Sequence, residues 1–204
     1  MESFQVFAQP WWVNFIIVVP GVIYFFCRRK GLQLGWEKIF ALSAFALAFG
    51  FVEATVVVYL RAAIGLLPGY AGTLADVRRS SVAYQQIQSI RHLPQSLVVI
   101  EVIREAATMI MLVCVAMLAS SRTRERLASF LWAFAVWDIA YYAGLWATVG
   151  WPGSFKALDV LFLIPVPWIA QVWFPLLVST LTLLALVLAR SRTRAAASLA
   201  ASSD

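Results

Sequence analysis

The chain has 204 residues, of which 62% are hydrophobic and 13% charged, with a formal net charge of +6. Soluble domains are usually about 45–50% apolar and about 25% charged, and a soluble core of this length cannot hide so much apolar surface. The mean hydropathy of +0.83 points the same way. The composition therefore indicates a multi-spanning membrane protein and excludes an ordinary soluble enzyme.

The same counts exclude several kinds of site. His92 is the one histidine, so we expect no haem held by two histidines and no histidine-rich metal cluster. Cys27 and Cys114 lie far apart in apolar runs and are expected to be small buried apolar residues. The sequence has no P-loop, GxGxxG or HExxH motif. Because the basic residues fall at the ends of apolar runs, membrane topology explains the net charge, and we expect no nucleic-acid partner.

Apolar runs of about 20 residues, long enough to cross a bilayer, occur five times. They cover residues 10–27, 39–60, 97–119, 127–149 and 160–189. The last run is longer than one span needs, and Pro165, Pro167 and Pro175 within it disturb a helix. We expect either a kinked span or a short re-entrant segment followed by a helix from about residue 170. The predicted fold is an all-α integral membrane bundle of about five transmembrane helices, forming a single domain over residues 1–190.

The distribution of Lys and Arg predicts the orientation of this bundle. Ten basic residues fall on the side of the C-terminus and five on the other side, most of these in or beside one long loop. By the positive-inside rule, the N-terminus is outside and the C-terminus inside. The first apolar run has Glu2 before it and its basic residues after it, so we expect a retained anchor and not a cleaved signal peptide.

Two segments lie outside the predicted spans. The outer loop at residues 68–94 has apolar residues near one helical face and polar residues on the other, which predicts an amphipathic helix on the outer surface. Thr73 and Asp76 in it resemble a capping box. Such a helix would be either a packing lid over the bundle or a gate over a site beneath it. The tail at residues 191–204 has no apolar period and is expected to be a disordered cytoplasmic segment.

Ionisable side chains inside the predicted spans are the main functional feature, because each costs roughly 2.5–3.5 kcal/mol at mid-membrane. At a rise of about 1.5 Å per residue, those of three spans converge on one level, in the outer half or at the midplane. These residues are Glu53, Glu101, Arg104, Glu105 and Asp138, with Arg61 and Asp159 at outer ends of spans.

Helical spacing places several of these groups on shared faces. Glu101 and Glu105 are four residues apart, with Arg104 beside them. Asp138 shares a face with Tyr141 and Tyr142 at the third and fourth positions after it. The third predicted span carries three such charges, so it needs partners inside the bundle.

The predicted layer has more carboxylates than guanidiniums. If all seven groups were ionised, the net charge would be −3, which a low-dielectric interior does not tolerate. Protonation of some carboxylates, a hard cation among them, or an open water-filled cavity would each relieve this charge. A structural role, in which Glu–Arg pairs hold the helices in register, is a further alternative.

We therefore predict an intramembrane polar site that opens to the outer side. Its expected residues are, for catalysis, Glu105, Asp138, Tyr141 and Tyr142; for substrate binding, Arg61 and Arg104; and for a divalent metal ion, Glu53, Glu101, Glu105 and Asp138. With a metal, the site would support chemistry on a lipid-phase substrate. The alternatives are a proton- or cation-coupled carrier and a non-catalytic membrane subunit or assembly factor. Membrane lipid is the expected partner, with a homodimer or another membrane subunit left open.

Four strings carry a resemblance to other proteins. They are EATVVVYLR at residues 53–61, EVIREAAT at 101–108, WDIAYY at 137–142 and DVLFLIPVPW at 159–168. Together they resemble a group of uncharacterised bacterial multi-pass membrane proteins, over roughly the last three quarters of the chain. The resemblance implies a location in the bacterial cytoplasmic (inner) membrane, and it implies no particular activity.

Overall fold

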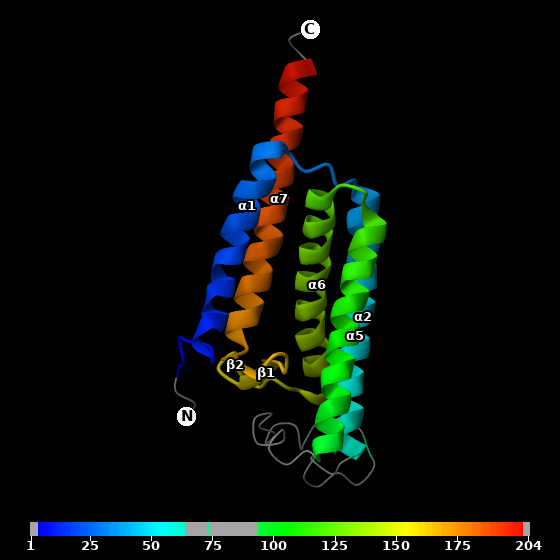
Figure 1. Cartoon of the computed structure of the whole chain (residues 1–204), viewed down its shortest axis with the longest axis vertical. Coiled ribbons are helices and arrows are strands. Elements are labelled where there is room, and N and C mark those ends of the chain that lie inside the picture. The colour runs from blue at the N-terminus through cyan, green and yellow to red at the C-terminus, as the bar shows by residue number, and fades with distance from the viewer. Residues whose placement is uncertain (1–3, 64–72, 74–93, 202–204) are drawn as a thin grey trace.

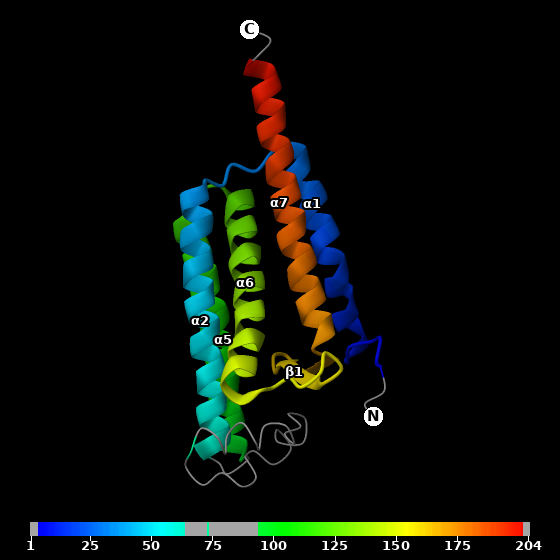
Figure 2. The ribbon, with the colours of Figure 1, turned by 180° about the vertical axis from the view of Figure 1, so that it is seen from behind.

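The computed structural model describes residues 4–63, 73 and 94–201, with the side chains of 29–30, 61–63 and 191–201 outside that description. Both ribbon views show long helices lying side by side along one axis (Figures 1 and 2). The N-terminus and a β-hairpin lie at one end of this bundle, and the C-terminus lies at the other. In chain order the elements are the 3-10 helix η1 (Trp11–Val18), α1 (Val19–Lys30), α2 (Trp36–Ala63), α5 (Gln95–Ala119), α6 (Thr123–Val149), β1 (Leu158–Phe162), β2 (Trp168–Gln171) and α7 (Trp173–Ala201).

In the described part of the chain, four helical segments are long and apolar enough to cross a membrane. They are Trp11–Arg28, Trp36–Leu60, Thr123–Val149 and Trp173–Arg190. These segments agree with four of the five predicted spans. Helix α5 occupies the place of the remaining one and runs beside α6, but it carries Glu101, Arg104 and Glu105. The chain is therefore a mostly helical membrane protein, while its orientation and the crossing by α5 stay predictions.

Helix α6 is the centre of the bundle, because it contacts α2, α5 and α7. Helix α7 packs in turn against α1, and the two lie together on one side of the molecule (Figure 1). Arg190 fastens the α1–α2 connection to α7, since its Nε donates a 2.8 Å hydrogen bond to the carbonyl oxygen of Leu34 and its guanidinium lies 3.9 Å from the ring centroid of Trp36. The helices are thus held together at the end opposite the hairpin.

Small residues let α2 and α6 approach closely. A Cβ atom at Gly50 would lie 2.6 Å from the carbonyl oxygen of Trp137 and 2.8 Å from the Cβ of Ala140. On the facing helix, a Cβ at Gly144 would lie 2.9 Å from the Cβ of Ala54. Close backbone approach is a common way to associate helices in lipid, where van der Waals packing replaces the hydrophobic driving force. This contact brings the following turn of α2, with its buried glutamate, against the centre of the bundle.

Replacing Gly50 by alanine is expected to destabilise the protein, because the added methyl group meets a backbone oxygen that cannot move aside. Overpacking of this kind costs about 1–3 kcal/mol. Gly21→Ala is the matched control, since a Cβ at Gly21 meets nothing within 4 Å. Thermal unfolding in detergent, followed by circular dichroism, checks the prediction. Equal midpoints for the two variants would contradict the close approach.

The fifth predicted span begins differently from the expectation. Strands β1 and β2 form an antiparallel hairpin with Asp159 opposite Ala170, and helix α7 begins only at Trp173. The kinked-helix alternative is therefore wrong, and the re-entrant alternative is nearer, although the segment is a hairpin. Pro165 and Pro167 lie in the connection between the strands, where the N–H groups that they lack are not needed by a ladder.

The N-terminal segment fastens this hairpin to η1. Gln9 and Ile169 exchange two backbone hydrogen bonds, each of 2.7 Å, as an isolated antiparallel bridge. In both ribbon views the hairpin lies across the end of the bundle, between α7 and the α2–α5–α6 group. It therefore covers the end at which the predicted charged residues lie.

Three smaller expectations have different outcomes. Helix α7 continues to Ala201, through most of the tail expected to be disordered; alanine, arginine and leucine are strong helix formers. Cys27 is buried as expected, but Cys114 is exposed on α5, and neither is in a disulfide. The amphipathic helix expected at residues 68–94 falls almost entirely on residues outside those described.

Candidate functional site

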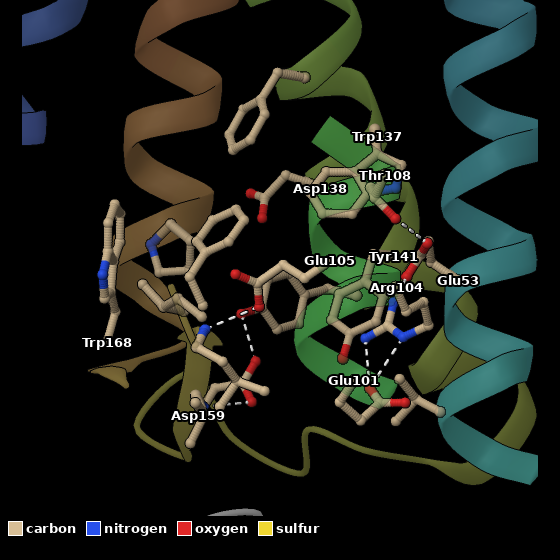
Figure 3. A pocket seen from close by; sticks show the side chains of 18 of the residues that line it. Glu53, Glu101, Arg104, Glu105, Thr108, Trp137, Asp138, Tyr141, Asp159 and Trp168 are labelled. Atoms are coloured by element: carbon tan, nitrogen blue, oxygen red, sulfur yellow. Dashed lines mark hydrogen bonds and ion pairs between the residues drawn. The ribbon is translucent and has the colours of Figure 1, made fainter. Parts of the chain in front are cut away.

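A cavity of about 180 Å³ lies at the hairpin end of the bundle, enclosed by α2, α5, α6, α7 and the hairpin (Figure 3). Its polar lining residues are Glu53, Glu101, Arg104, Glu105, Thr108, Asp138, Tyr141, Tyr142, Asp159 and Ser179. The predicted site residues thus line one cavity. The exception is Arg61, whose side chain lies outside the described part of the chain. Aromatic rings make up much of the remaining wall: Phe134, Trp137, Phe162, Trp168 and Phe174.

Arg104 joins α5 to α2 by holding two carboxylates. Its Nε and Nη2 donate hydrogen bonds of 2.9 and 2.7 Å to Oε2 of Glu101, one turn earlier on the same helix. Its Nη1 donates to Oε2 of Glu53 on α2. The hydroxyl of Thr108 donates a 2.5 Å hydrogen bond to the other oxygen of Glu53. The buried Glu53 carboxylate is therefore satisfied at both oxygens, and the guanidinium is engaged by the protein and not by a ligand.

Glu105 holds the hairpin. Its Oε2 accepts a 2.8 Å hydrogen bond from the backbone N–H of Leu163, and its Oε1 accepts one of 3.2 Å from Ile164. Both donors lie in the connection between β1 and β2, where neither has a partner in the strand ladder. An unsatisfied backbone N–H is costly in a membrane interior. The predicted catalytic or metal-binding carboxylate is thus an anchor for backbone groups.

A second link joins the hairpin to α6. The hydroxyl of Tyr142 donates a 2.7 Å hydrogen bond to Oδ2 of Asp159, and the N–H of Val160 donates to Oδ1 at 2.8 Å. Asp159 is 1% exposed. Tyr142 and Asp159 are thus joined by an ordinary hydrogen bond, in which the phenol is the donor and the carboxylate the acceptor.

Asp138 is the carboxylate that the protein satisfies least. It is 9% exposed, and its Oδ2 accepts a 2.8 Å hydrogen bond from Ser179 of α7. No residue that the structure describes donates a hydrogen bond to its Oδ1. Figure 3 shows the Asp138 carboxylate pointing from α6 into the space beside α7. An unsatisfied acceptor oxygen at the wall of a cavity is a place where a ligand can bind.

Aromatic side chains of α6 and of the hairpin form one connected row along the cavity wall. On α6, the ring of Trp137 lies 5.5 Å from that of Phe134 and 6.3 Å from that of Tyr141, which lies 5.2 Å from Tyr142. From the hairpin, the ring of Phe162 lies 6.1 Å from Phe134 and 5.2 Å from Trp168. These spacings are typical of packed aromatic clusters. The cavity therefore has rigid apolar walls around a small number of polar groups.

The predicted metal site does not fit this geometry. Within the described residues, no group of three or more His, Cys, Asp or Glu side chains is placed to hold a metal ion. The four expected donors are instead engaged by the protein itself: Glu53 and Glu101 share Arg104, Glu105 binds the hairpin backbone, and Asp138 binds Ser179. Because their oxygens are directed to different places, we derive no metal chemistry from them.

The sequence also contained polar residues that we did not select. Thr108 lies three residues after Glu105, so helical spacing already placed it on the carboxylate face of α5. Ser179 stands within an apolar span, and it contacts the cavity because α7 begins after the hairpin. The backbone donors of Leu163 and Ile164 had no signal in the sequence, since a backbone group becomes a site only through its conformation.

Comparison with known proteins adds no relative to this description. No family model, curated protein or solved structure matches the chain. The cavity and its side chains are therefore the basis for any statement about function.

Proposed function

We propose that this multi-pass membrane protein binds a small, mainly apolar molecule in the cavity at the hairpin end and holds it beside the Asp138 carboxylate. The observation that carries the proposal is the cavity of about 180 Å³, which is lined by aromatic rings and by a carboxylate to whose Oδ1 no described residue donates. Ligand sites generally have this composition: a concave apolar wall with a few polar groups that fix the orientation of the ligand.

The size of the cavity limits the ligand. An engineered cavity of about 150 Å³ accommodates benzene, so this one suits a molecule with a single ring, or one end of a longer molecule. Protein interiors are otherwise packed as densely as organic crystals. A bundle whose polar layer served packing alone would have no reason to leave a space of this size beside a buried carboxylate.

Two parts of the polar layer have different roles in this proposal. Arg104 and Glu105 maintain the architecture, because their contacts join α5 to α2 and to the hairpin. Asp138 and the Tyr142–Asp159 pair are the groups placed to hold the ligand and to exchange protons with it. This division keeps the expected acid–base role for Asp138 and Tyr142. It gives Arg104 a structural role in place of the expected substrate-binding role.

We place the cavity in the outer half of a bacterial inner membrane. Arg122, Arg124 and Arg126 follow the end of α5 that lies away from the hairpin; Arg28 lies near the end of α1, and Arg190 contacts the α1–α2 connection. The excess of basic residues at that end supports its assignment to the cytoplasmic side.

A cavity-filling substitution tests the proposal. Val178 lines the cavity from α7, so Val178→Phe is expected to remove the space, while Leu184→Phe on the exposed side of the same helix is the control. Toluene, phenethyl alcohol, phenethylamine and phenylacetate serve as probes, because a ligand that binds only the folded state raises the midpoint of thermal unfolding.

We expect at least one probe to stabilise the wild-type protein and the Leu184→Phe variant in a saturable manner, and to have no such effect on Val178→Phe. The measurement is thermal unfolding in a neutral maltoside detergent over a range of probe concentrations. If no probe stabilises the wild type, or if Val178→Phe responds equally, the cavity is not a binding site for molecules of this size.

A further inference from the structure

The charges on the cavity wall are unequal. Among the lining side chains that the structure describes, five are carboxylates and Arg104 is the one cation. Arg104 donates from Nε, Nη1 and Nη2 to Glu53 and Glu101. Its positive charge is therefore already balanced by these two carboxylates. The rest of the wall therefore has an excess of negative charge.

The remaining carboxylates differ in how they are satisfied. Glu105 accepts two backbone N–H groups, and Asp159 accepts a phenol and a backbone N–H. Asp138 accepts a single hydroxyl although it is as buried as Glu105. A buried carboxylate requires a donor or a positive charge at each oxygen. Asp138 is thus the point of the wall to which the described residues supply no positively charged donor.

The aromatic rings that line the cavity also favour a positively charged ligand. The faces of tryptophan, tyrosine and phenylalanine rings attract cations that lie within about 6 Å of the centroid. Trp137 and Tyr141 lie one residue before and three residues after Asp138 on α6, and Phe162 and Trp168 line the same cavity from the hairpin. Rings and a carboxylate around one cavity together favour an organic cation over a metal ion, for which the described residues provide no group of donors.

We infer that the ligand of this cavity is a protonated amine with an apolar or aromatic body, its ammonium group bound to Asp138. This inference rests on the proposed function, and it adds the chemical class of the ligand. The ammonium would donate to Oδ1 of Asp138, while the apolar body occupies the space between the aromatic rings. An anionic ligand would be repelled by the excess of carboxylates. A neutral ligand would leave the charge of Asp138 unbalanced.

Isosteric probes of different charge test this inference on the wild-type protein. Phenethylamine, phenethyl alcohol and phenylacetate share a ring and a short arm and differ in charge at neutral pH. We expect the amine to bind about tenfold more tightly than the alcohol, and the acid to bind more weakly than both. Binding is measured by isothermal titration calorimetry in a neutral maltoside detergent, where micelle partitioning is not saturable.

A variant then assigns the preference to one carboxylate. Asp138→Asn is expected to reduce the ratio between amine and alcohol to less than about threefold and to leave the affinity for the alcohol unchanged, because the amide keeps the shape and loses the charge. Glu125→Gln is the matched control: Glu125 is also buried on α6 and also accepts one serine hydroxyl, from Ser120, but it lies at the far end of the helix.

The outcomes separate this inference from the proposed function. Equal affinities of the amine and the alcohol in the wild type would overturn the inference and leave the cavity as a binding site for neutral molecules. An unchanged ratio in Asp138→Asn would remove Asp138 from the site. Failure of all three probes and of toluene to bind would overturn the proposed function itself. The wild-type comparison needs no variant, so it remains decisive if Asp138→Asn does not fold.

A second arm distinguishes the source of the ammonium group, since a free amine and the headgroup of an aminophospholipid both supply one. Dihexanoylphosphatidylethanolamine is added as a competitor against bound phenethylamine. Competition supports a lipid headgroup as the source, and its absence, with tight binding of phenethylamine, supports a free amine. In both cases the ammonium is the group recognised.

Discussion

Replacement of Arg104 by methionine is expected to destabilise the protein by about 3–5 kcal/mol, because it leaves two carboxylates in the bundle without their cation. Glu53 is 5% exposed and accepts hydrogen bonds from the guanidinium of Arg104 and from the hydroxyl of Thr108. Glu101 receives two bonds from the same guanidinium. Since the Arg104 side chain is 28% exposed, some solvent reaches the cluster, and we expect the lower end of this range.

Charge removal in the partners provides the control for this prediction. The triple variant Glu53→Gln, Glu101→Gln, Arg104→Met has no unpaired charge and is expected to recover most of the lost stability. Arg104→Lys keeps the charge but not the planar arrangement of donors, so its stability should lie between those of the wild type and of Arg104→Met. The measurement is thermal unfolding in detergent, together with the fraction of protein that elutes as a single species in size-exclusion chromatography. A triple variant no more stable than Arg104→Met would mean that Arg104 acts through packing and not through its charge.

The helices could be predicted because lipid imposes a strong requirement on sequence. A spanning helix needs about 20 apolar residues, and three of the predicted runs begin within a few residues of helices α2, α5 and α6. The hairpin could not be predicted in the same way. Residues 158–171 are as apolar as a helix, and a short apolar run without periodicity does not distinguish a strand from a helix. The prolines indicated a break, but they did not indicate which segments would pair.

The polar layer was predictable as a set of residues and not as a set of contacts. Helical spacing placed Glu101 beside Arg104 and Asp138 on the face of Tyr142. Which residues contact each other across two helices depends on the rotation and depth of each helix. The spacing of residues within one helix does not give this information. The contact of Glu53 with Arg104 therefore appeared only in three dimensions. The metal prediction has no support among the described residues for the same reason: a surplus of carboxylates shows that charge must be balanced, and it does not show what balances it.

Substitution of Glu105 by glutamine is expected to loosen the hairpin. The amide offers one acceptor oxygen in place of two, and its NH₂ group would face a backbone N–H of Leu163 or Ile164, so the cost should be about 2–4 kcal/mol. Hydrogen–deuterium exchange measures this directly, as faster exchange at those two amides. Glu101→Gln is the control, because Glu101 lies one turn away on the same helix and its charged bonds go to Arg104. Unchanged protection of Leu163 and Ile164 would contradict the anchoring role.

The same variant separates closure of the cavity from recognition of the ligand. Leu163 and Phe162 line the cavity from the hairpin, so a loosened hairpin should weaken the binding of phenethylamine and of phenethyl alcohol by the same factor. Asp138→Asn should instead weaken only the amine, since it removes a charge and leaves the wall in place. A loss confined to the amine in Glu105→Gln would mean that Glu105 also contributes its charge to the ligand, and that the ammonium lies between two carboxylates and not beside one.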